Sequence, residues 1–393
     1  MTTPLAFLCG VSLFACFSFV SLHGEDTALP AEIIQRSVVS IGDTARLQRA
    51  MAKARRGEKV VIAFVGGSIT WGARASTASH SYVSLVADWW RQEFPSAQIE
   101  VVNAGIGATG TNFAALRLQR DVLSRNPDVL FVEFAVNDKN LKENAETLEG
   151  VVRQGLKSSS RPALILLFMV SKSGESAQEW FVKVGSHYGL TMISYRDAIY
   201  PEIQSGKLKW EDLSPDTVHS NDIGHRYTAQ LVSSYLKTIL KTLPENEKKE
   251  KDSPVPAPLF TDLYDSTVLT AGDALKPCTN QGWQAISDRN VVGWKATEFG
   301  SEIEFETHGT VIYLQYWKIN GPMGKVSVTV DGENSHEIDG WFDQTWGGYF
   351  CMQVIGENLS PGNHRVRIKL LSDCNASSSG HEFIITAMGS AGL

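Results

Sequence analysis

Two hydrophobic patterns divide this chain. In the first part, continuous apolar runs alternate with segments whose apolar residues recur at helical spacing. Strands are expected over 59–66, 98–105, 127–138 and 163–170, and helices over 81–94, 113–125 and 227–243. Strands that are apolar on both faces are typical of a parallel sheet covered by helices on both sides. The pattern predicts an α/β domain, and such sheets bind ligands at the carboxyl ends of their strands.

In the second part, apolar and polar residues alternate, which gives a hydrophobic period of two residues. Short alternating strands with glycine-rich turns are expected within 301–317, 324–332, 364–371 and 381–388, which predicts an all-β sandwich of the jelly-roll-like kind. Residues 244–257 are first charged and then proline-rich, as in a linker. We therefore expect a lead-in over 25–57, the α/β domain over 58–243, a linker over 244–257 and the sandwich over 258–393.

The N-terminus differs from both parts. Residues 4–22 are almost entirely apolar or small and precede a polar stretch, as in a secretory signal peptide, here expected over 1–24. No Lys or Arg precedes the apolar run, and an uncleaved membrane anchor is the alternative. A lipoprotein form, with Cys16 as the lipidated residue, is a third. All three interpretations predict that the protein is exported to the periplasm or to the outside of the cell.

Charge and cysteine content narrow the function classes. The 393 residues carry a formal net charge of −7 and no long basic block, so we expect no nucleic-acid partner. After signal cleavage three cysteines remain, which permits one disulfide with Cys351–Cys374 as the favoured pair, and one free thiol at Cys278. No Cys/His spacing indicates zinc, and we expect neither metal nor cofactor.

Polar residues follow the predicted strands of the α/β domain. Ser68 comes after the first strand, "NAGIGATG" (103–110) after the second, Asn137 after the third, and "DTVH" (216–219) precedes the closing helix. Acyl transfer needs a hydroxyl nucleophile, an imidazole base, an orienting carboxylate and oxyanion donors. Each residue alone is more typical of a turn or a cap. Thr70 stands where an α/β-hydrolase elbow needs glycine, which excludes that fold.

The four blocks "GGSIT", "NAGIGATG", "AVND" and "DTVHSNDIGH" occur in the order found in the SGNH (GDSL-like) hydrolases, and residues 58–243 resemble this family. The resemblance implies a three-layer α/β/α fold with a parallel sheet. It implies Ser68 as nucleophile, His219 as general base and Asp216 as the residue that orients it. The oxyanion donors would be the N–H of Ser68, the N–H of Ala108 (or of Gly107 after a one-residue shift) and the amide of Asn137.

The chain departs from the family pattern at three positions. Gly67 replaces the usual Asp of the first block, Ala108 aligns with the oxyanion glycine, and Ala135 replaces the glycine that opens the third block. No reacting group is lost, although a non-glycine residue at 108 restricts the local backbone.

The substrate is expected to be an acylated carbohydrate, since the protein is exported and carries a sandwich with aromatic residues over 341–350. These aromatics would stack on sugars, or they form ordinary sandwich core. Trp71 and His80 are candidates for substrate binding. Alternatives are a lipolytic, lysophospholipase-like esterase, an acyltransferase, and a glycan-binding protein with an inactive hydrolase domain. No stable membrane partner is expected after cleavage, and the oligomeric state stays open.

Overall fold

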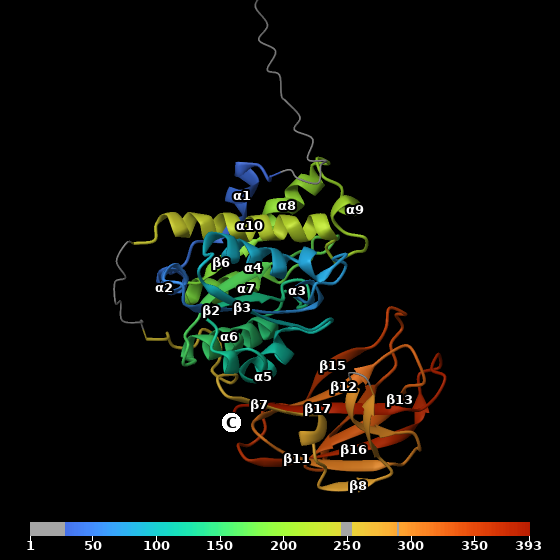
Figure 1. Ribbon diagram of the computed structural model, residues 1–393. Coiled ribbons are helices and arrows are strands. Elements are labelled where there is room, and N and C mark those ends of the chain that lie inside the picture. The colour runs from blue at the N-terminus through green and yellow to red at the C-terminus, as the bar shows by residue number, and fades with distance from the viewer. Residues whose placement is uncertain (1–27, 245–253, 289–290) are drawn as a thin grey trace, which may run out of the picture.

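The computed structural model describes residues 28–244, 254–288 and 291–393 (Figure 1). The expected signal peptide and most of the expected linker lie outside the described residues. Within the described ranges, no helix is both long enough and apolar enough to cross a membrane.

A six-stranded sheet forms the centre of the first domain. Its order is β1-β6-β5-β4-β2-β3, with β2 to β6 parallel and β1 antiparallel to β6 at the edge. The strands are β1 (Val38–Ser40), β2 (Lys59–Gly66), β3 (Gln98–Gly105), β4 (Val129–Glu133), β5 (Ala163–Phe168) and β6 (Thr191–Ser194). Because β2 lies between β3 and β4, the carboxyl ends of these three strands meet at one point of the sheet edge.

Helices cover both faces of this sheet, as the hydrophobic pattern predicts. Along β2, Val60, Ile62 and Phe64 face one core and the intervening residues face the other. The first core lies under α1 (Ala31–Ser37), α2 (Ala45–Arg55), α4 (Tyr82–Glu93), α8 (Tyr195–Gln204) and α10 (Asp222–Lys241). The second lies under α5 (Thr111–Asp121), α6 (Lys142–Lys157) and α7 (Gln178–His187). Short helices α3 (Ser68–Trp71) and α9 (Trp210–Leu213), with 3₁₀ turns at Ala78–His80 and Leu123–Arg125, join these elements.

Several boundaries differ from the expected ones. β4 ends at Glu133, and residues 134–138 form a turn rather than the end of a strand. The residues expected as a lead-in supply α1, β1 and α2, so most of 25–57 is packed into the first domain. The hydrophobic pattern did not predict the short strand β6 or the helices α6, α7 and α8.

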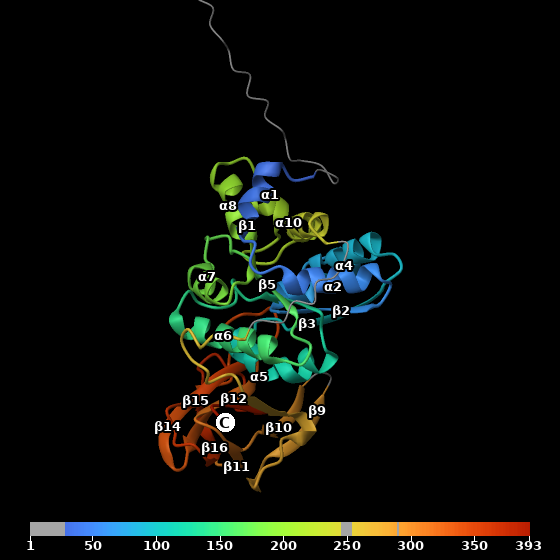
Figure 2. The same ribbon diagram turned by 90° about the vertical axis from the view of Figure 1, so that its left-hand side faces the viewer.

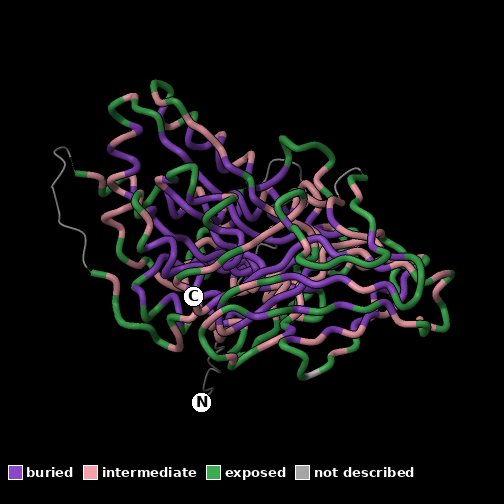
Figure 3. Tube along the Cα trace, turned by 90° about the horizontal axis from the view of Figure 1, so that it is seen from below, coloured by how far each residue is buried: buried purple, intermediate pink, exposed green. Residues whose placement is uncertain are grey.

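The second domain consists of two antiparallel sheets that face each other across a separate core. One sheet has the order β15-β12-β17-β10-β9, with β7 also paired to β17, and the other β14-β13-β16-β11-β8. Buried residues alternate with more exposed ones along β13 and β16, whereas β12 and β17 are buried along most of their length (Figure 3). The elements are β7 (Thr267–Ala271), a 3₁₀ turn (Gly272–Ala274), β8 (Thr279–Gln281), β9 (Gln284–Asp288), β10 (Val291–Ala296), β11 (Glu302–His308), β12 (Val311–Lys318), β13 (Gly324–Val330), β14 (Glu333–Asp339), β15 (Tyr349–Gly356), β16 (Asn363–Cys374) and β17 (Phe383–Ala391).

The two domains share a core. The cluster between the sheet and α5 to α7 continues into the sandwich through Tyr264, Val311, Tyr313 and Ala391. In Figure 2 the sandwich lies directly against α5 and α6. The Tyr264 and Tyr313 hydroxyls are 2.6 Å apart in this buried region. An apolar interface of this kind fixes the sandwich against the first domain.

A network of charged residues accompanies the apolar interface. Glu149 on α6 is fully buried and accepts hydrogen bonds from the backbone N–H groups of residues 259–261. Arg153, one turn further along α6, holds both oxygens of Asp265 at 2.7 Å. A planar guanidinium that binds both oxygens of a carboxylate restricts rotation between the partners.

The predicted disulfide is wrong. Cys278, Cys351 and Cys374 are all free thiols. Cys351 lies in β15 of one sheet and Cys374 ends β16 of the facing sheet. Cys351 lies opposite Tyr316 of β12 and Cys374 lies opposite Gly324 of β13, so the two cysteines are not neighbours in either sheet.

Candidate active site

The turn after β2 places Ser68 at the carboxyl edge of the sheet. A Cβ at Gly66 would lie 2.0 Å from Thr70 Oγ1, and one at Gly67 would lie 2.1 Å from Asn137 Oδ1. Both positions therefore require glycine. The aspartate usual at position 67 in the SGNH pattern does not fit here, because the Asn137 amide occupies its space.

Ser68, His219 and Asp216 form a hydrogen-bonded row. The Ser68 hydroxyl lies 2.8 Å from His219 Nε2, and His219 Nδ1 lies 3.0 Å from Asp216 Oδ2. Ser68 begins α3, and the other two residues lie in the loop before α10. In this arrangement Nδ1–H donates to the carboxylate, which leaves Nε2 free to accept the serine proton.

Backbone groups fix the Asp216 carboxylate. Its Oδ1 accepts hydrogen bonds from the N–H groups of Val218 and His219, at 2.9 and 2.8 Å. Burial alone would raise the pKa of Asp216, but these backbone bonds and the His219 ring outweigh it and lower the pKa to about 2. Asp216 is consequently ionised at any pH at which an esterase works.

The segments that carry the expected oxyanion donors lie close to Ser68. As the first residue of α3, Ser68 has a backbone N–H without an acceptor inside the helix. A Cβ at Gly107 would lie 3.8 Å from Ser68 Cβ, so the loop after β3 passes beside the serine. The Asn137 amide lies on the other side, against Gly67.

Ala108 adopts a backbone conformation that favours glycine. Its φ is +57°, in the left-handed region. A residue with a Cβ is less stable there than glycine by about 1 kcal/mol. The alanine keeps its N–H, so this chain retains the donor while accepting local strain.

Two carboxyl groups close to the site, the half-buried Asp138 and the buried Glu133, were assigned no role by sequence analysis. Asp138 accepts hydrogen bonds from both the N–H and the hydroxyl of Thr111 at the start of α5. Glu133, fully buried at the end of β4, accepts one from the Thr70 hydroxyl at 3.0 Å. Burial raises the pKa of each to about 7. Glu133 thus bonds the turn after β2 through Thr70, and Asp138 bonds the start of α5 through Thr111.

The rim of the site is formed by residues 71–81. Trp71 ends α3 and is 66% exposed, so its ring is available to a ligand next to Ser68. His80 points its Nδ1 toward Ser76 Oγ (2.7 Å) and Asp222 Oδ2 (3.0 Å). These contacts of His80 hold the loop to the start of α10, and the substrate contacts predicted for Trp71 and His80 stay predictions. Arg74, which the sequence did not point to, contacts Asp216.

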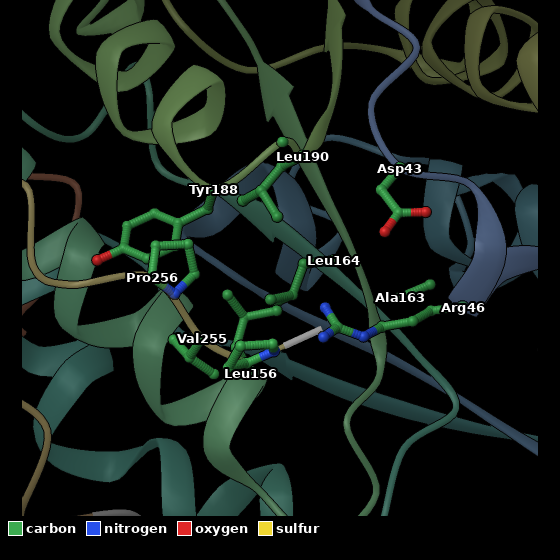
Figure 4. A pocket seen from close by; sticks show the side chains of 11 residues that line it. Asp43, Arg46, Leu156, Ala163, Leu164, Tyr188, Leu190, Val255 and Pro256 are labelled. Carbon is green, nitrogen blue, oxygen red and sulfur yellow. The ribbon is translucent and has the colours of Figure 1, made fainter. Parts of the chain in front are cut away.

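A cavity of about 110 Å³ elsewhere in the chain has no connection to these residues (Figure 4). It lies at the amino ends of β5 and β6, whereas Ser68 lies at the carboxyl edge. Residues 254–256, which lead into the sandwich, form one of its walls. Among the described residues, no group of three or more His, Cys, Asp or Glu side chains is placed to hold a metal ion.

The chain is similar to several known proteins. A two-domain esterase active on acetylated mannans, solved alone and with mannopentaose, is 29% identical and covers 91% of this chain and 98% of its own, with a TM-score of 0.84 in both structures. A curated relative, the uncharacterized lipoprotein YqeF of Bacillus subtilis, is 25% identical over 194 residues, 46% of this chain and 72% of the relative. The profile of the GDSL-like Lipase/Acylhydrolase family matches residues 64–227. The first domain of this chain thus belongs to the GDSL-like lipase/acylhydrolase (SGNH) family.

Proposed function

We propose that this protein is an exported serine esterase that removes O-acetyl groups from a polysaccharide or oligosaccharide. The observation that carries the reaction is the 2.8 Å contact between Ser68 Oγ and His219 Nε2, with ionised Asp216 behind the imidazole. The substrate class is supported by the similarity of both domains to an esterase active on acetylated mannans.

The chemistry proceeds in two displacements. Ser68 Oγ attacks the acetyl carbonyl carbon while its proton moves to His219 Nε2, and the C–O bond to the sugar breaks as that proton passes to the sugar oxygen. Water then attacks the acetyl-serine, gives a proton to Nε2, and releases acetate as Ser68 recovers its proton. The N–H groups of Ser68 and Ala108 and the Asn137 amide stabilise the oxyanion in both steps. Losing one such donor costs about 3 kcal/mol.

Aromatic side chains provide candidate sugar contacts. Trp71 is exposed beside Ser68. In the sandwich, Phe342, Trp346 and Tyr349 form an edge-packed cluster with ring centroids 5.1–5.6 Å apart, and Trp346 is 57% exposed. Flat aromatic faces pack against the apolar faces of sugar rings. This exposed cluster supports a sugar-binding interpretation of residues 341–350 over a purely structural one.

Export is part of the proposal. The apolar run over 4–22 followed by polar residues supports a signal peptide. The name of the curated relative describes a lipoprotein, so retention on a membrane by a lipid anchor is the second form to test. Mass spectrometry of the mature N-terminus distinguishes a chain that begins after residue 24 from a lipidated Cys16.

The decisive experiment measures acetate release by the mature protein from acetylated mannan, acetylated xylan and a series of soluble esters of increasing acyl length. Ser68→Ala is the test variant. Ser124→Ala, which removes a surface hydroxyl bonded to the Arg120 carbonyl, is the matched control. We expect acetate from a polysaccharide with wild type and control, and none with Ser68→Ala.

Other results would contradict specific parts of the proposal. Activity only on long-chain esters would indicate a lipolytic enzyme. Transfer of acetyl to a second sugar, without free acetate, would indicate an acyltransferase. Turnover by Ser68→Ala would refute the acyl-serine mechanism, and glycan binding without turnover by wild type would indicate a binding protein.

A further inference from the structure

An arginine outside the proposed chemistry contacts the carboxylate of the triad. Arg74 Nε donates a hydrogen bond to Asp216 Oδ2 at 3.1 Å. The same oxygen accepts the hydrogen bond from His219 Nδ1 at 3.0 Å. The arginine and the imidazole therefore meet at Oδ2, while Oδ1, which lies 3.1 Å from His219 Nδ1, also accepts the two backbone hydrogen bonds.

The backbone at Arg74 is held in an unfavourable conformation. Its φ is +67°, in the left-handed region that disfavours residues with a Cβ. Such a conformation persists only where its surroundings maintain it, and it occurs most often at functional sites. A loop free to relax would place this arginine in an ordinary conformation, away from Asp216.

The start of α10 supplies that restraint on both sides of Arg74. His225, buried in α10, lies with its Nε2 3.2 Å from the Ala73 carbonyl oxygen. Asp222 accepts hydrogen bonds from the N–H and the hydroxyl of Ser76, each at 2.7 Å. Because α10 directly follows the loop of Asp216 and His219, one element fixes both partners of the Arg74–Asp216 pair.

We propose that Arg74 is a positioning residue of this esterase, which holds the Asp216 carboxylate in place and takes up part of its negative charge. With that charge shared, the carboxylate attracts a positive charge on the imidazole less strongly. The proposal rests on the proposed function, because it concerns the same triad.

Other charged groups near the triad are already paired. From α10, Asp222 pairs with His80, and His225 bonds the Tyr82 N–H through Nδ1. Lys172, whose N–H bonds the Thr217 carbonyl, pairs its ammonium with Glu211 of α9 at 2.6 Å. Of all these groups, Arg74 is the cation in contact with Asp216.

The test compares Arg74→Ala and Arg74→Lys with wild type. Arg91→Ala is the matched control, because it removes an equally exposed arginine that pairs with Asp88 on α4. The pH profiles of kcat and KM are measured with a small soluble acetyl ester, which is too short to reach far along the rim. The Arg74 side chain is 58% exposed, so solvent screens its charge and the expected effects are moderate.

For Arg74→Ala we expect kcat to fall roughly fivefold with KM unchanged, and the midpoint of the acidic limb of kcat/KM to rise by about 0.5 pH unit. Arg74→Lys keeps the charge and should restore most of the midpoint. The control should match wild type. The proposal would be overturned if the midpoint of the acidic limb of kcat/KM were unchanged in Arg74→Ala, or if KM rose while kcat stayed unchanged. If Ser68→Ala stays inactive in that case, the esterase mechanism survives and only the role of Arg74 fails.

Discussion

Replacing Glu149 by alanine tests how the two domains are joined. The side chain is fully buried on α6 and accepts hydrogen bonds from the N–H groups of Leu259, Phe260 and Thr261, at 2.5, 2.8 and 3.0 Å. It also accepts one from the Tyr188 hydroxyl at 2.6 Å. A hydrogen bond to a charged group contributes about 1.5–3 kcal/mol, and an unsatisfied buried donor costs a similar amount.

Exposure of the backbone donors lowers the free-energy cost expected for each lost hydrogen bond. Residues 259–261 are partly exposed, so water replaces some of the lost bonds, and each of the three backbone donors then costs about 1–1.5 kcal/mol. We expect Glu149→Ala to lower the free energy of unfolding by about 4 kcal/mol. Glu149→Gln keeps one acceptor oxygen but turns an NH₂ group toward backbone donors, so we expect an intermediate loss of about 2 kcal/mol.

Urea denaturation followed by tryptophan fluorescence measures both losses. Glu143→Ala is the matched control, because Glu143 is exposed in the first turn of the same helix, and its loss should stay within about 0.5 kcal/mol. Loss of docking should also separate one cooperative transition into two. A Glu149→Ala protein that unfolds at the wild-type urea concentration, in one transition, would refute the reasoning.

Three further predictions concern the site. Ala108→Gly relieves the left-handed strain at φ +57° and keeps the N–H donor, so thermal unfolding should show a gain of up to about 1 kcal/mol with activity retained. Gly67→Ala places a Cβ 2.1 Å from Asn137 Oδ1, so kcat should fall at least tenfold in a steady-state assay. Burial raises the pKa of Glu133 to about 7, so the free energy of unfolding of wild type falls as pH rises from 4.5 to 7. Glu133→Gln cannot ionise and avoids this loss. Denaturation at both pH values should show that the variant becomes more stable relative to wild type at the higher pH.

The sequence predicted the side chains that meet at the sheet edge because Ser68 and Asn137 come shortly after strands, and because the block with Asp216 and His219 matches the family pattern before the closing helix. Ser68 and Asn137 need only the strand register to be correct, and the structure places Ser68, His219 and Asp216 within hydrogen-bond distance of one another. Their catalytic roles remain a proposal. The alternation of apolar runs and helical segments likewise predicted a parallel sheet with two covered faces, and this is confirmed.

What the sequence did not predict depends on long-range or conformational detail. The contact of Arg74 with Asp216 requires a left-handed φ that no local pattern announces for an arginine. Glu149 resembles an ordinary surface glutamate of a helix, because its partners are backbone groups more than 100 residues away. The disulfide prediction failed because cysteine count gives no information on which sheet each cysteine occupies.

The core shared by the two domains limits how this protein can change over evolutionary time. A Cβ at Gly389 in β17 would lie 2.6 Å from Leu116 of α5, so enlarging a residue on one side requires shrinking its neighbour on the other. A sandwich from another protein would lack the matching face, and Glu149 and Arg153 would lose their partners in residues 259–265 and keep the Tyr188 hydroxyl. The shared core therefore couples substitutions in the first domain to substitutions in the sandwich, and exchanging either domain alone would remove part of that core.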